Sequence, residues 1–450
     1  MMIKKKFNSV IFAIVCSSTL CCFWWKLSSS PAFQSLLVPG IAISIISEQQ
    51  SFYAFRGLGA NGKKVDSETS FQIASVSKTL YAWATLKWAK ENHFSLDHPL
   101  KEIFSSLSTP LLSPFSEVTI SQLLSHCSGI SSIQYRGYPN PENCPDLYCS
   151  LSGSRGNNPR IKLIKEPGSS FAYSGGGYTL LEYLITQKEL CSTLSFLNRY
   201  LDDSFHDFDL AKTPNYLEPH SVWGTSMNQR YFTEKAAAGL WASASTMSNF
   251  LKKILSDLGR DFLSEMIQSR KSGYGLGIEV EKMDFGNFCF HLGANPGWRS
   301  GIFFVPEKNL GLAVLTNSCS GQRVVMDNLK KWLSSNDLSL PQLYRRELSC
   351  RRIWLVASLL SFALFFYQLF KHVQINQTLR RKKARKSLSY LLVPTLLLSL
   401  AFFYLDSFPP KGWIVASFFP WEIHLFSLSL IFLVGLHFIN HAINTIRDDR

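Results

Sequence analysis

The stretch that decides the fold is FQIASVSKTLYAWATLKWA, residues 71–89, in which Ser75 is followed three positions later by Lys78. The apolar spacing from residue 77 to residue 92 predicts a helix, and residues three apart on a helix share one face. A serine hydroxyl becomes a good nucleophile when a neighbouring base removes its proton, and a desolvated lysine amine can be that base. The pair therefore predicts a nucleophile and its base at the start of a helix.

Short apolar segments at both ends of the same region predict strands. Their alternation and the turn residues between them are typical of neighbouring antiparallel strands. The predicted strands are residues 40–46, 51–60, 274–281, 285–293, 300–306 and 310–318. Strands, then helices, then strands favour a mixed α/β domain whose sheet joins both of its ends, closed by a helix at residues 324–334.

Two further motifs follow the serine in order: YSG at residues 173–175 and HLGA at residues 291–294. Together with SVSK at residues 75–78 they resemble the three active-site motifs of penicillin-recognising serine hydrolases. This family includes class C β-lactamases, D-alanyl-D-alanine carboxypeptidases, D-amino-acid amidases and related esterases. The segments LLSHCSGI, AAAGLWASASTMSNFL and GYGLGIEV add to the resemblance, which runs from about Val38 to Ser335. It implies an α/β (α+β) domain of the β-lactamase/transpeptidase type over residues 33–340, with an antiparallel sheet, flanking helices and a helical subdomain.

The resemblance also implies roles for single residues. Ser75 would be the nucleophile, Lys78 the base or proton relay, and Tyr173 the phenol that protonates the leaving group and later activates water. The backbone N–H groups of Ser75 and Ala294 would form the oxyanion hole, and Gly293 would let substrate lie against the strand edge. The structural alternatives are a helix N-cap for the serine, a solvated lysine and a core tyrosine.

Two positions depart from the commonest family pattern. Gly175 stands where many relatives carry an Asn whose amide contacts substrate, and His291 stands where β-lactamases carry a lysine. A histidine carries at most a partial charge near neutral pH, and Arg299 is our candidate for supplying the missing charge. His126 would be structural, bracing a helix–loop junction, rather than part of a catalytic triad.

These motifs predict a serine hydrolase that forms an acyl-enzyme with an amide or ester carbonyl. The expected substrates are peptides that contain D-amino acids, such as those of the cell wall. An esterase or lipid hydrolase, a true β-lactamase and a non-catalytic membrane sensor are the alternatives. The intact serine, lysine and tyrosine argue against the sensor, because a pure binding domain needs no base.

Composition limits the partners. Hydrophobic residues make up 46% of the 450 residues and charged residues 17%, with a formal net charge of +14. The surplus of basic residues lies beside apolar stretches. Basic clusters in such places set membrane topology and bind lipid headgroups, so we expect no nucleic acid as a partner.

The sequence motifs suggest no cofactor or metal site. The run GLGANG at residues 57–62 matches a dinucleotide fingerprint but opens no helix, and no Cys-x-x-Cys pair suggests zinc. We therefore expect neither a cofactor nor a metal. Cys144 and Cys149 bracket a short loop. Two alternatives stay open for the pair: a local disulfide or free thiols.

The apolar stretches predict membrane attachment. Residues 1–32 join a basic start to the run VIFAIVCSSTLCCFWW, which indicates a signal peptide or an N-terminal membrane anchor. Residues 353–370, 388–408 and 413–440 each approach the roughly 20 residues that a spanning helix needs, with buried core helices as the alternative. The basic loop after the first of these is expected to be cytoplasmic, so the catalytic region would lie outside the cytoplasm, in the periplasm of a bacterium. The expected partners are the lipid bilayer and a peptide or ester substrate.

Overall fold

The structure is a computed structural model that divides into two compact units, residues 36–342 and residues 1–35 together with 343–450. The residues it describes are 36–350 apart from 60–61, 132–134, 157, 202–215 and 257–259, with scattered positions between 352 and 367. All predicted site residues belong to the unit 36–342.

The predicted membrane segments fall almost entirely outside the described residues. This is so for residues 1–32, 388–408 and 413–440, and residues 353–370 are described only at scattered positions. Among the helices of the described part, none has both the length and the apolar character needed to cross a bilayer. The anchor and the three spans therefore stay predictions.

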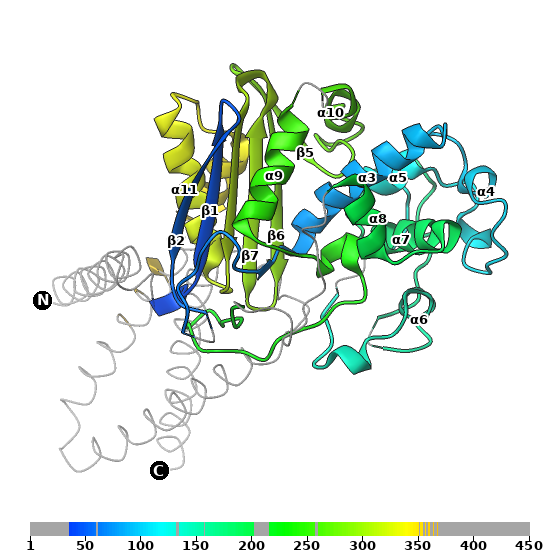
Figure 1. The fold of residues 1–450 in the computed structure, drawn as a ribbon, viewed down its shortest axis with the longest axis horizontal. Coiled ribbons are helices and arrows are strands. Elements are labelled where there is room, and N and C mark those ends of the chain that lie inside the picture. The colour runs from blue at the N-terminus through cyan, green and yellow to red at the C-terminus, as the bar shows by residue number, and fades with distance from the viewer. Residues whose placement is uncertain are drawn as a thin grey trace, which may run out of the picture. The chain divides into compact units, whose positions relative to one another are not determined.

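The unit 36–342 is built on one antiparallel sheet of six strands in the order β2-β1-β8-β7-β6-β5 (Figure 1). Its strands are β1 (Ile41–Ser47), β2 (Gln50–Arg56), β5 (Glu279–Met283), β6 (Gly286–Asn295), β7 (Trp298–Val305) and β8 (Leu310–Thr316). Strand β1 pairs with β8 from Ile41↔Thr316 to Ser47↔Leu310. The sheet thus joins the two ends of the region, which confirms the order of elements predicted from the sequence.

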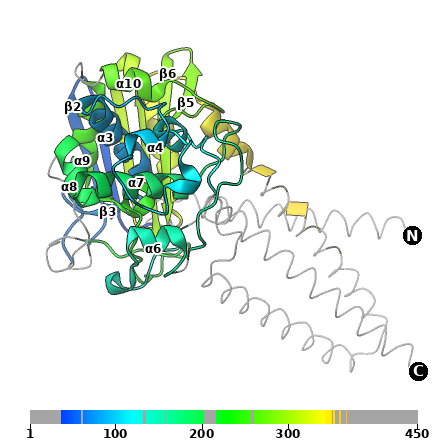
Figure 2. The ribbon, with the colours of Figure 1, turned by 90° about the vertical axis from the view of Figure 1, so that its right-hand side faces the viewer.

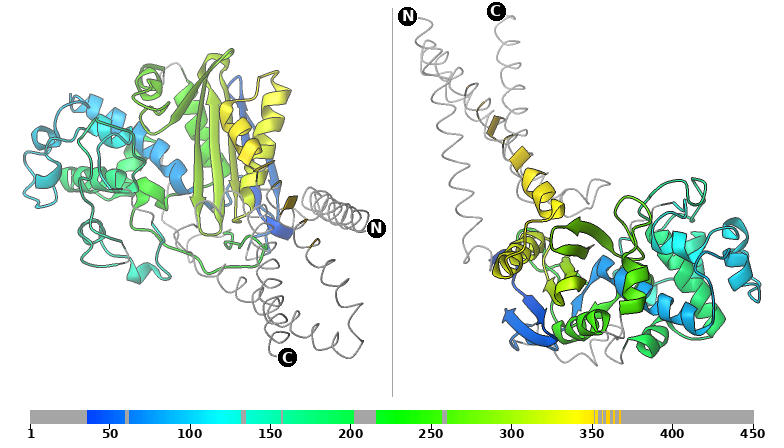
Figure 3. Two further views of the ribbon diagram at one scale, coloured as in Figure 1. Left: turned by 180° about the vertical axis from the view of Figure 1, so that it is seen from behind. Right: turned by 90° about the horizontal axis from the view of Figure 1, so that it is seen from above.

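One long helix covers each face of the sheet (Figures 1 and 3). Helix α9 (Ala244–Leu255) lies over Gly311, where an added Cβ would stand 3.1 Å from Leu251. Helix α11 (Gly321–Ser335) lies over Gly301, where an added Cβ would stand 2.8 Å from Val325. Side chains alternate between faces along a strand, and this alternation later decides which residues can meet the predicted nucleophile.

A helical part extends beyond the β5 edge of the sheet (Figures 1 and 2). Its elements are α4 (Leu100–Ile103), α5 (Ile120–Leu124), α6 (Leu147–Ser152), α7 (Gly175–Glu189) and α8 (Thr193–Tyr200), and α10 (Arg260–Ile267) lies beside α9. Helix α3 (Ser77–Glu91) runs through the core, and most of its residues, polar ones included, are buried. Near α6, Cys144 and Cys149 are not joined by a disulfide, so of the two predicted alternatives the structure has the thiols.

Candidate active site

The predicted nucleophile lies on a tight turn between strand β3 (Phe71–Gln72) and helix α3. Ser75 is the middle residue of a single 3-10 turn, η1 (Ala74–Val76). Ala74 has a φ of +49°, a left-handed conformation that a non-glycine residue adopts only when its surroundings enforce it. Ser77 donates its hydroxyl hydrogen to the Ala74 carbonyl at 2.6 Å, and Ser300 of β7 donates to the Ile73 carbonyl at 2.7 Å. The turn is therefore held from the helix and from the sheet.

Lys78 lies in the first turn of α3, and its amine is within hydrogen-bond distance of the Ser75 hydroxyl. Its Nζ is 3.2 Å from the Ser75 Oγ and 2.5 Å from the carbonyl oxygen of Ala237. The side chain is 2% exposed, and this burial lowers the pKa of Lys78 to about 7. A large fraction of the amine is then neutral near pH 7, as a general base requires. The alternative of a solvated lysine is contradicted.

Ala237 belongs to a short π-helix, η4 (Lys235–Gly239), that contacts α3, α7 and the η1 turn. The neighbouring Ala238 carbonyl accepts from Asn295 Nδ2 of β6 at 3.0 Å. The N-terminal turn of η4 is fixed by Glu182 of α7, whose carboxylate accepts the Ala236 N–H at 3.0 Å. A π-turn is often found at functional sites, and here it carries the carbonyl that fixes the lysine.

Tyr173 precedes helix α7 and reaches the same atoms. Its hydroxyl lies close enough to the Ser75 side chain for that group to affect its pKa, and the Lys78 Nζ stands 5.0 Å from the centre of its ring. Burial of the hydroxyl raises the pKa of Tyr173, and the contact with Ser75 opposes that rise in part. The residue as a whole is 39% exposed, so solvent reaches part of it. A protonated phenol next to the nucleophile can deliver a proton to a leaving group.

His126 and Ser174 hold this tyrosine in place. The Ser174 N–H donates to His126 Nδ1 at 3.1 Å, and the imidazole ring centre lies 4.1 Å from that of Tyr173. Ser174 also caps α7 by accepting the Gly177 N–H at 3.2 Å, so Gly175 is the first residue of that helix. The contact agrees with the bracing role predicted for His126.

His291 on β6 is neutral, and both of its ring nitrogens have partners. Nδ1 lies 2.9 Å from the Leu292 carbonyl and must carry the hydrogen, because a carbonyl only accepts. Nε2 lies 3.0 Å from the Tyr274 hydroxyl, which therefore donates to it. Burial, with a smaller contribution from the Lys78 charge, lowers the pKa of His291 to about 3. Tyr274 was not among the residues predicted from the sequence; its only signal is its place between two glycines in GYGLGIEV.

Gly293 allows β6 to approach the nucleophile turn. An added Cβ would lie 2.1 Å from the Ser300 Oγ and 2.3 Å from the Ile73 carbonyl oxygen. The glycine is therefore required for this close approach, and its predicted role of letting substrate lie against the strand edge stays a prediction. The next residue, Ala294, points its backbone N–H to the side away from β7, because Asn295 and Trp298 flank a two-residue hairpin loop. Strand β5 pairs only with residues 286–290 of β6, so this edge is not covered by β5 at Ala294.

We expect Gly293→Ala to reduce activity and to destabilise the fold. The methyl group would force the Ile73–Ser75 turn away from β6, and overpacking of this kind costs about 1–3 kcal/mol. Gly177→Ala is the matched control, because its Cβ would meet Leu123 at an ordinary 3.4 Å inside helix α7. Thermal unfolding and kcat/KM of both variants test this, and an unchanged Gly293→Ala enzyme would contradict the close approach.

Arg299 does not reach the site, which corrects our prediction that it supplies the missing charge. Ser300 faces the η1 turn, so the preceding Arg299 points to the opposite face of the sheet. There an added Cβ on Gly321 of α11 would lie 3.1 Å from the Arg299 Cβ. The fully buried guanidinium donates from Nη1 to the carbonyls of Asn295 at 2.8 Å and Trp298 at 2.5 Å. The sequence does not reveal on which face of the sheet Arg299 lies, because a shift of one residue in the strand register moves a side chain to the other face.

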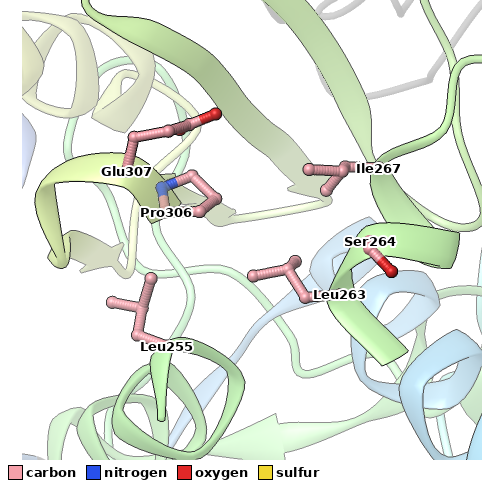
Figure 4. A pocket seen from close by; sticks show the side chains of 6 residues that line it. All are labelled: Leu255, Leu263, Ser264, Ile267, Pro306 and Glu307. Carbon is pink, nitrogen blue, oxygen red and sulfur yellow. The ribbon is translucent and has the colours of Figure 1, made fainter. Parts of the chain in front are cut away.

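A separate hollow lies between α9, α10 and the 3-10 turn η6 (Pro306–Lys308), as Figure 4 shows. It is lined by Leu255, Leu263, Ser264, Ile267, Pro306 and Glu307. The Glu307 carboxylate already accepts from the Asn287 N–H at 3.1 Å and from its Nδ2 at 2.7 Å. The hollow contains none of the residues around Ser75, so we assign the chemistry to the serine site.

The sheet, its covering helices and the Ser75–Lys78–Tyr173 arrangement are those of a β-lactamase-like serine hydrolase. The model of the Beta-lactamase family matches residues 32–334, and the chain belongs to that family. Among curated relatives, "Protein flp" of Staphylococcus aureus is 23% identical over 307 residues, which cover 62% of this chain and 60% of that protein. The match thus spans about three fifths of the relative's length.

Two solved structures are similar in fold. The octameric penicillin-binding protein homologue from Pyrococcus abyssi has a TM-score of 0.56 at 23% identity, covering 74% of this chain and 78% of that chain. The D-alanine carboxypeptidase AmpC from Burkholderia cenocepacia has a TM-score of 0.51 at 17% identity, covering 69% of this chain and 94% of that chain. At these identities the likeness concerns the fold alone.

Proposed function

We propose that this protein hydrolyses an amide or ester carbonyl through an acyl-enzyme on Ser75. The observation that carries the proposal is the 3.2 Å distance between the Lys78 Nζ and the Ser75 Oγ, in a setting that brings the pKa of Lys78 to about 7. A binding protein gains nothing from a buried amine that is half neutral. A hydrolase needs it, because the serine must lose its proton as it attacks.

In the proposed reaction, the Ser75 oxygen attacks the carbonyl carbon while Lys78 takes the hydroxyl proton. The backbone N–H groups of Ser75 and Ala294 bind the oxyanion of the tetrahedral intermediate. The intermediate collapses as Tyr173 gives its proton to the leaving alcohol or amine, and Lys78 returns a proton to Tyr173. In the second half of the reaction, water attacks the carbonyl of the acyl-enzyme and gives up a proton through the same residues. The acid product leaves, and the Ser75 hydroxyl is restored.

Peptides that contain D-amino acids are the substrate class we propose first, supported by the fold shared with a D-alanine carboxypeptidase. Ester hydrolysis is the second candidate. Two observations favour it: Gly175 offers no amide to a peptide, and His291 is neutral with both nitrogens occupied.

We also propose that the chain is attached to a membrane with its catalytic unit outside the cytoplasm. The support is the sequence pattern: an apolar segment within residues 1–32, apolar stretches at 353–370, 388–408 and 413–440, and basic clusters beside them. The lipid bilayer is then a partner of the protein.

A reactive probe tests the proposed function on the full chain in detergent. A fluorophosphonate reacts with an activated serine, so we expect it to label the protein covalently, and a fluorescent β-lactam reports whether the site accepts a lactam. Turnover of D-alanyl peptides and of short p-nitrophenyl esters then ranks the two substrate classes. Absence of labelling by both probes, with no turnover of either class, would contradict the proposal and favour a non-catalytic binding domain.

A further inference from the structure

The Lys78 amine is held by a carbonyl that belongs to another element. A neutral amine has two N–H donors and one lone pair, and the lone pair must face the Ser75 hydroxyl to accept its proton. The Ala237 carbonyl oxygen, 2.5 Å from the Lys78 Nζ, takes one of the hydrogens and so restricts where the lone pair points. The Ser75 Oγ lies 3.2 Å from the same nitrogen. The proton transfer therefore depends on where η4 places its carbonyl.

Glu182 of helix α7 caps the beginning of η4 from outside. The first N–H groups of a helical segment have no partner within that segment. Here the Glu182 Oε2 accepts the Ala236 N–H at 3.0 Å, and its Oε1 accepts the Lys235 N–H at 3.2 Å. The Oε1 atom also accepts the Thr193 hydroxyl at 2.8 Å, and the side chain is fully buried. Both oxygens are thus in use, and all three partners donate.

A second buried carboxyl group lies next to η4 but binds elsewhere. Glu234 directly precedes η4 and is also fully buried. Its Oε1 accepts the Ser150 hydroxyl and, at 3.0 Å, the Asn158 Nδ2. Within the described residues it gives η4 no side-chain cap. The two glutamates therefore share burial and neighbourhood, while the side chain of Glu182 is the one that binds the η4 backbone.

The far end of η4 is fixed by the sheet and by α3. The Ala238 carbonyl accepts from Asn295 Nδ2 at 3.0 Å, and the Leu240 N–H donates to the Ser77 Oγ at 3.2 Å. Ala237 lies between these bonds and the carboxyl group from α7. Loss of the cap would leave η4 attached at one end, so its carbonyl groups could move away from the lysine.

We propose that Glu182 is a positioning residue of the acyl transfer, which holds the Ala237 carbonyl against the Lys78 amine. It acts through the η4 backbone and takes no part in the proton transfer itself. The inference rests on the proposed function and adds to it a side chain from the helix that Tyr173 precedes. The base and the phenol of the site would then both be placed by α7.

The charge of Glu182 affects how well it caps. Burial raises the pKa of Glu182 to about 8, and the hydrogen bonds from Thr193 and Ala236 oppose that rise. The protonated form carries a hydrogen among partners that all donate, so the ionised form is the better cap. Other titratable groups that interact with the carboxyl group are Glu234, Lys235 and Tyr81. The measurements therefore extend from pH 5 to pH 10, across both forms.

The test is Glu182→Gln in the full-length protein, with the best p-nitrophenyl ester as substrate. The amide has one acceptor oxygen and turns two donor hydrogens toward N–H groups, so it cannot cap as the carboxylate does. We expect kcat/KM at high pH to fall at least about tenfold, because the base is displaced. The Ala237 carbonyl favours the ammonium over the amine, so its withdrawal should lower the pH midpoint of kcat/KM by about one unit.

Glu234→Gln is the matched control. It changes an equally buried glutamate beside η4 and should leave the pH midpoint at the wild-type value, even if it lowers the Tm as much. An unchanged midpoint in Glu182→Gln would overturn the proposal. An equal shift in both variants would overturn it too, because the shift would then follow the lost charge and not the cap.

Thr193→Val is a milder variant that serves if Glu182→Gln does not fold. Loss of the Thr193 hydroxyl raises the pKa of Glu182, since that bond favours the ionised form. The carboxyl group then caps η4 less well near neutral pH, so the midpoint of kcat/KM should again move to lower pH, by less than one unit. An unchanged midpoint in this variant would overturn the proposal in that case.

Failure of the proposed function gives a different result. Absence of turnover and of probe labelling would contradict the acyl-enzyme, and the positioning role is then measured from stability. Glu182→Gln should lower the Tm less beside Lys78→Met than in the wild type, by roughly 2 °C or more, because the Ala237 carbonyl then has no amine to hold. Glu234→Gln should lower it equally in both backgrounds. Equal losses for Glu182→Gln, or a larger loss beside Lys78→Met, would overturn the proposal.

Discussion

Ser75→Ala is expected to abolish turnover and to prevent labelling by the fluorophosphonate probe. Without the hydroxyl no acyl-enzyme forms, and the loss of a nucleophile that acts together with its base lowers kcat by roughly 10⁴-fold or more. The turn that carries Ser75 is held by Ser77 and Ser300, not by the Ser75 hydroxyl, so the fold should persist. The measurement is kcat/KM with the best ester, alongside in-gel fluorescence.

Ser195→Ala is the matched control for this variant. Ser195 is exposed on helix α8 and shares a hydrogen bond only with the end of that helix, at Ser192. It should keep full labelling and full turnover. Labelling of Ser75→Ala at the wild-type rate would show that another residue is the nucleophile.

Lys78→Met is expected to remove activity and at the same time to stabilise the protein. The base contributes about 10²–10⁴-fold to the rate, so kcat/KM should fall by at least that factor. Burial lowers the pKa of Lys78 from 10.5 to about 7, so folding below pH 7 costs on the order of 5 kcal/mol, at roughly 1.4 kcal/mol for each pKa unit. Methionine removes this cost but leaves the Ala237 carbonyl without its donor, a loss of about 1–3 kcal/mol.

The net gain should raise the Tm by roughly 5–10 °C at pH 7. The sign follows from proton binding: between pH 7 and 10.5 the unfolded chain holds a proton on Lys78 that the folded chain has lost, so wild-type stability rises with pH across this window. The advantage of Lys78→Met should therefore shrink from pH 7 to pH 9. In the wild type, kcat/KM should rise with pH through a midpoint near 7 as the amine becomes neutral.

Lys330→Met is the control for the stability measurement, because Lys330 is exposed on helix α11. Its Tm should stay within about 2 °C of the wild type at both pH values, as surface substitutions usually do. A Lys78→Met protein that is less stable than the wild type at pH 7 would mean that the amine is charged in the folded state.

The fold was predictable because its signals are local and repeated. The strand segments alternate along the chain, and the helix after Ser75 has apolar residues at helical spacing, so both could be placed within a few residues. The pairing of β1 with β8 followed from the order of elements and the resemblance to a family. The Ser75–Lys78 contact followed from helix spacing alone.

The remainder depends on register and on long-range partners. Arg299 and Ser300 are neighbours in sequence, yet only the sheet decides that Ser300 meets the nucleophile turn and Arg299 does not. The partner of His291 Nε2 is Tyr274, seventeen residues away along the chain. No spacing rule predicts that Ala237, in a π-turn, supplies the carbonyl that fixes Lys78.

The pairing of β1 with β8 has a consequence for how the chain is made. The ribosome releases β1 early and β8 only after every other strand of the sheet. The edge of β1 that pairs with β8 therefore has no partner during most of synthesis. At roughly 5–20 residues per second that interval lasts tens of seconds, and nascent apolar strands attract aggregation while they wait. A nascent polypeptide halted before Leu310 cannot complete the sheet, and we expect quality-control proteases to remove it.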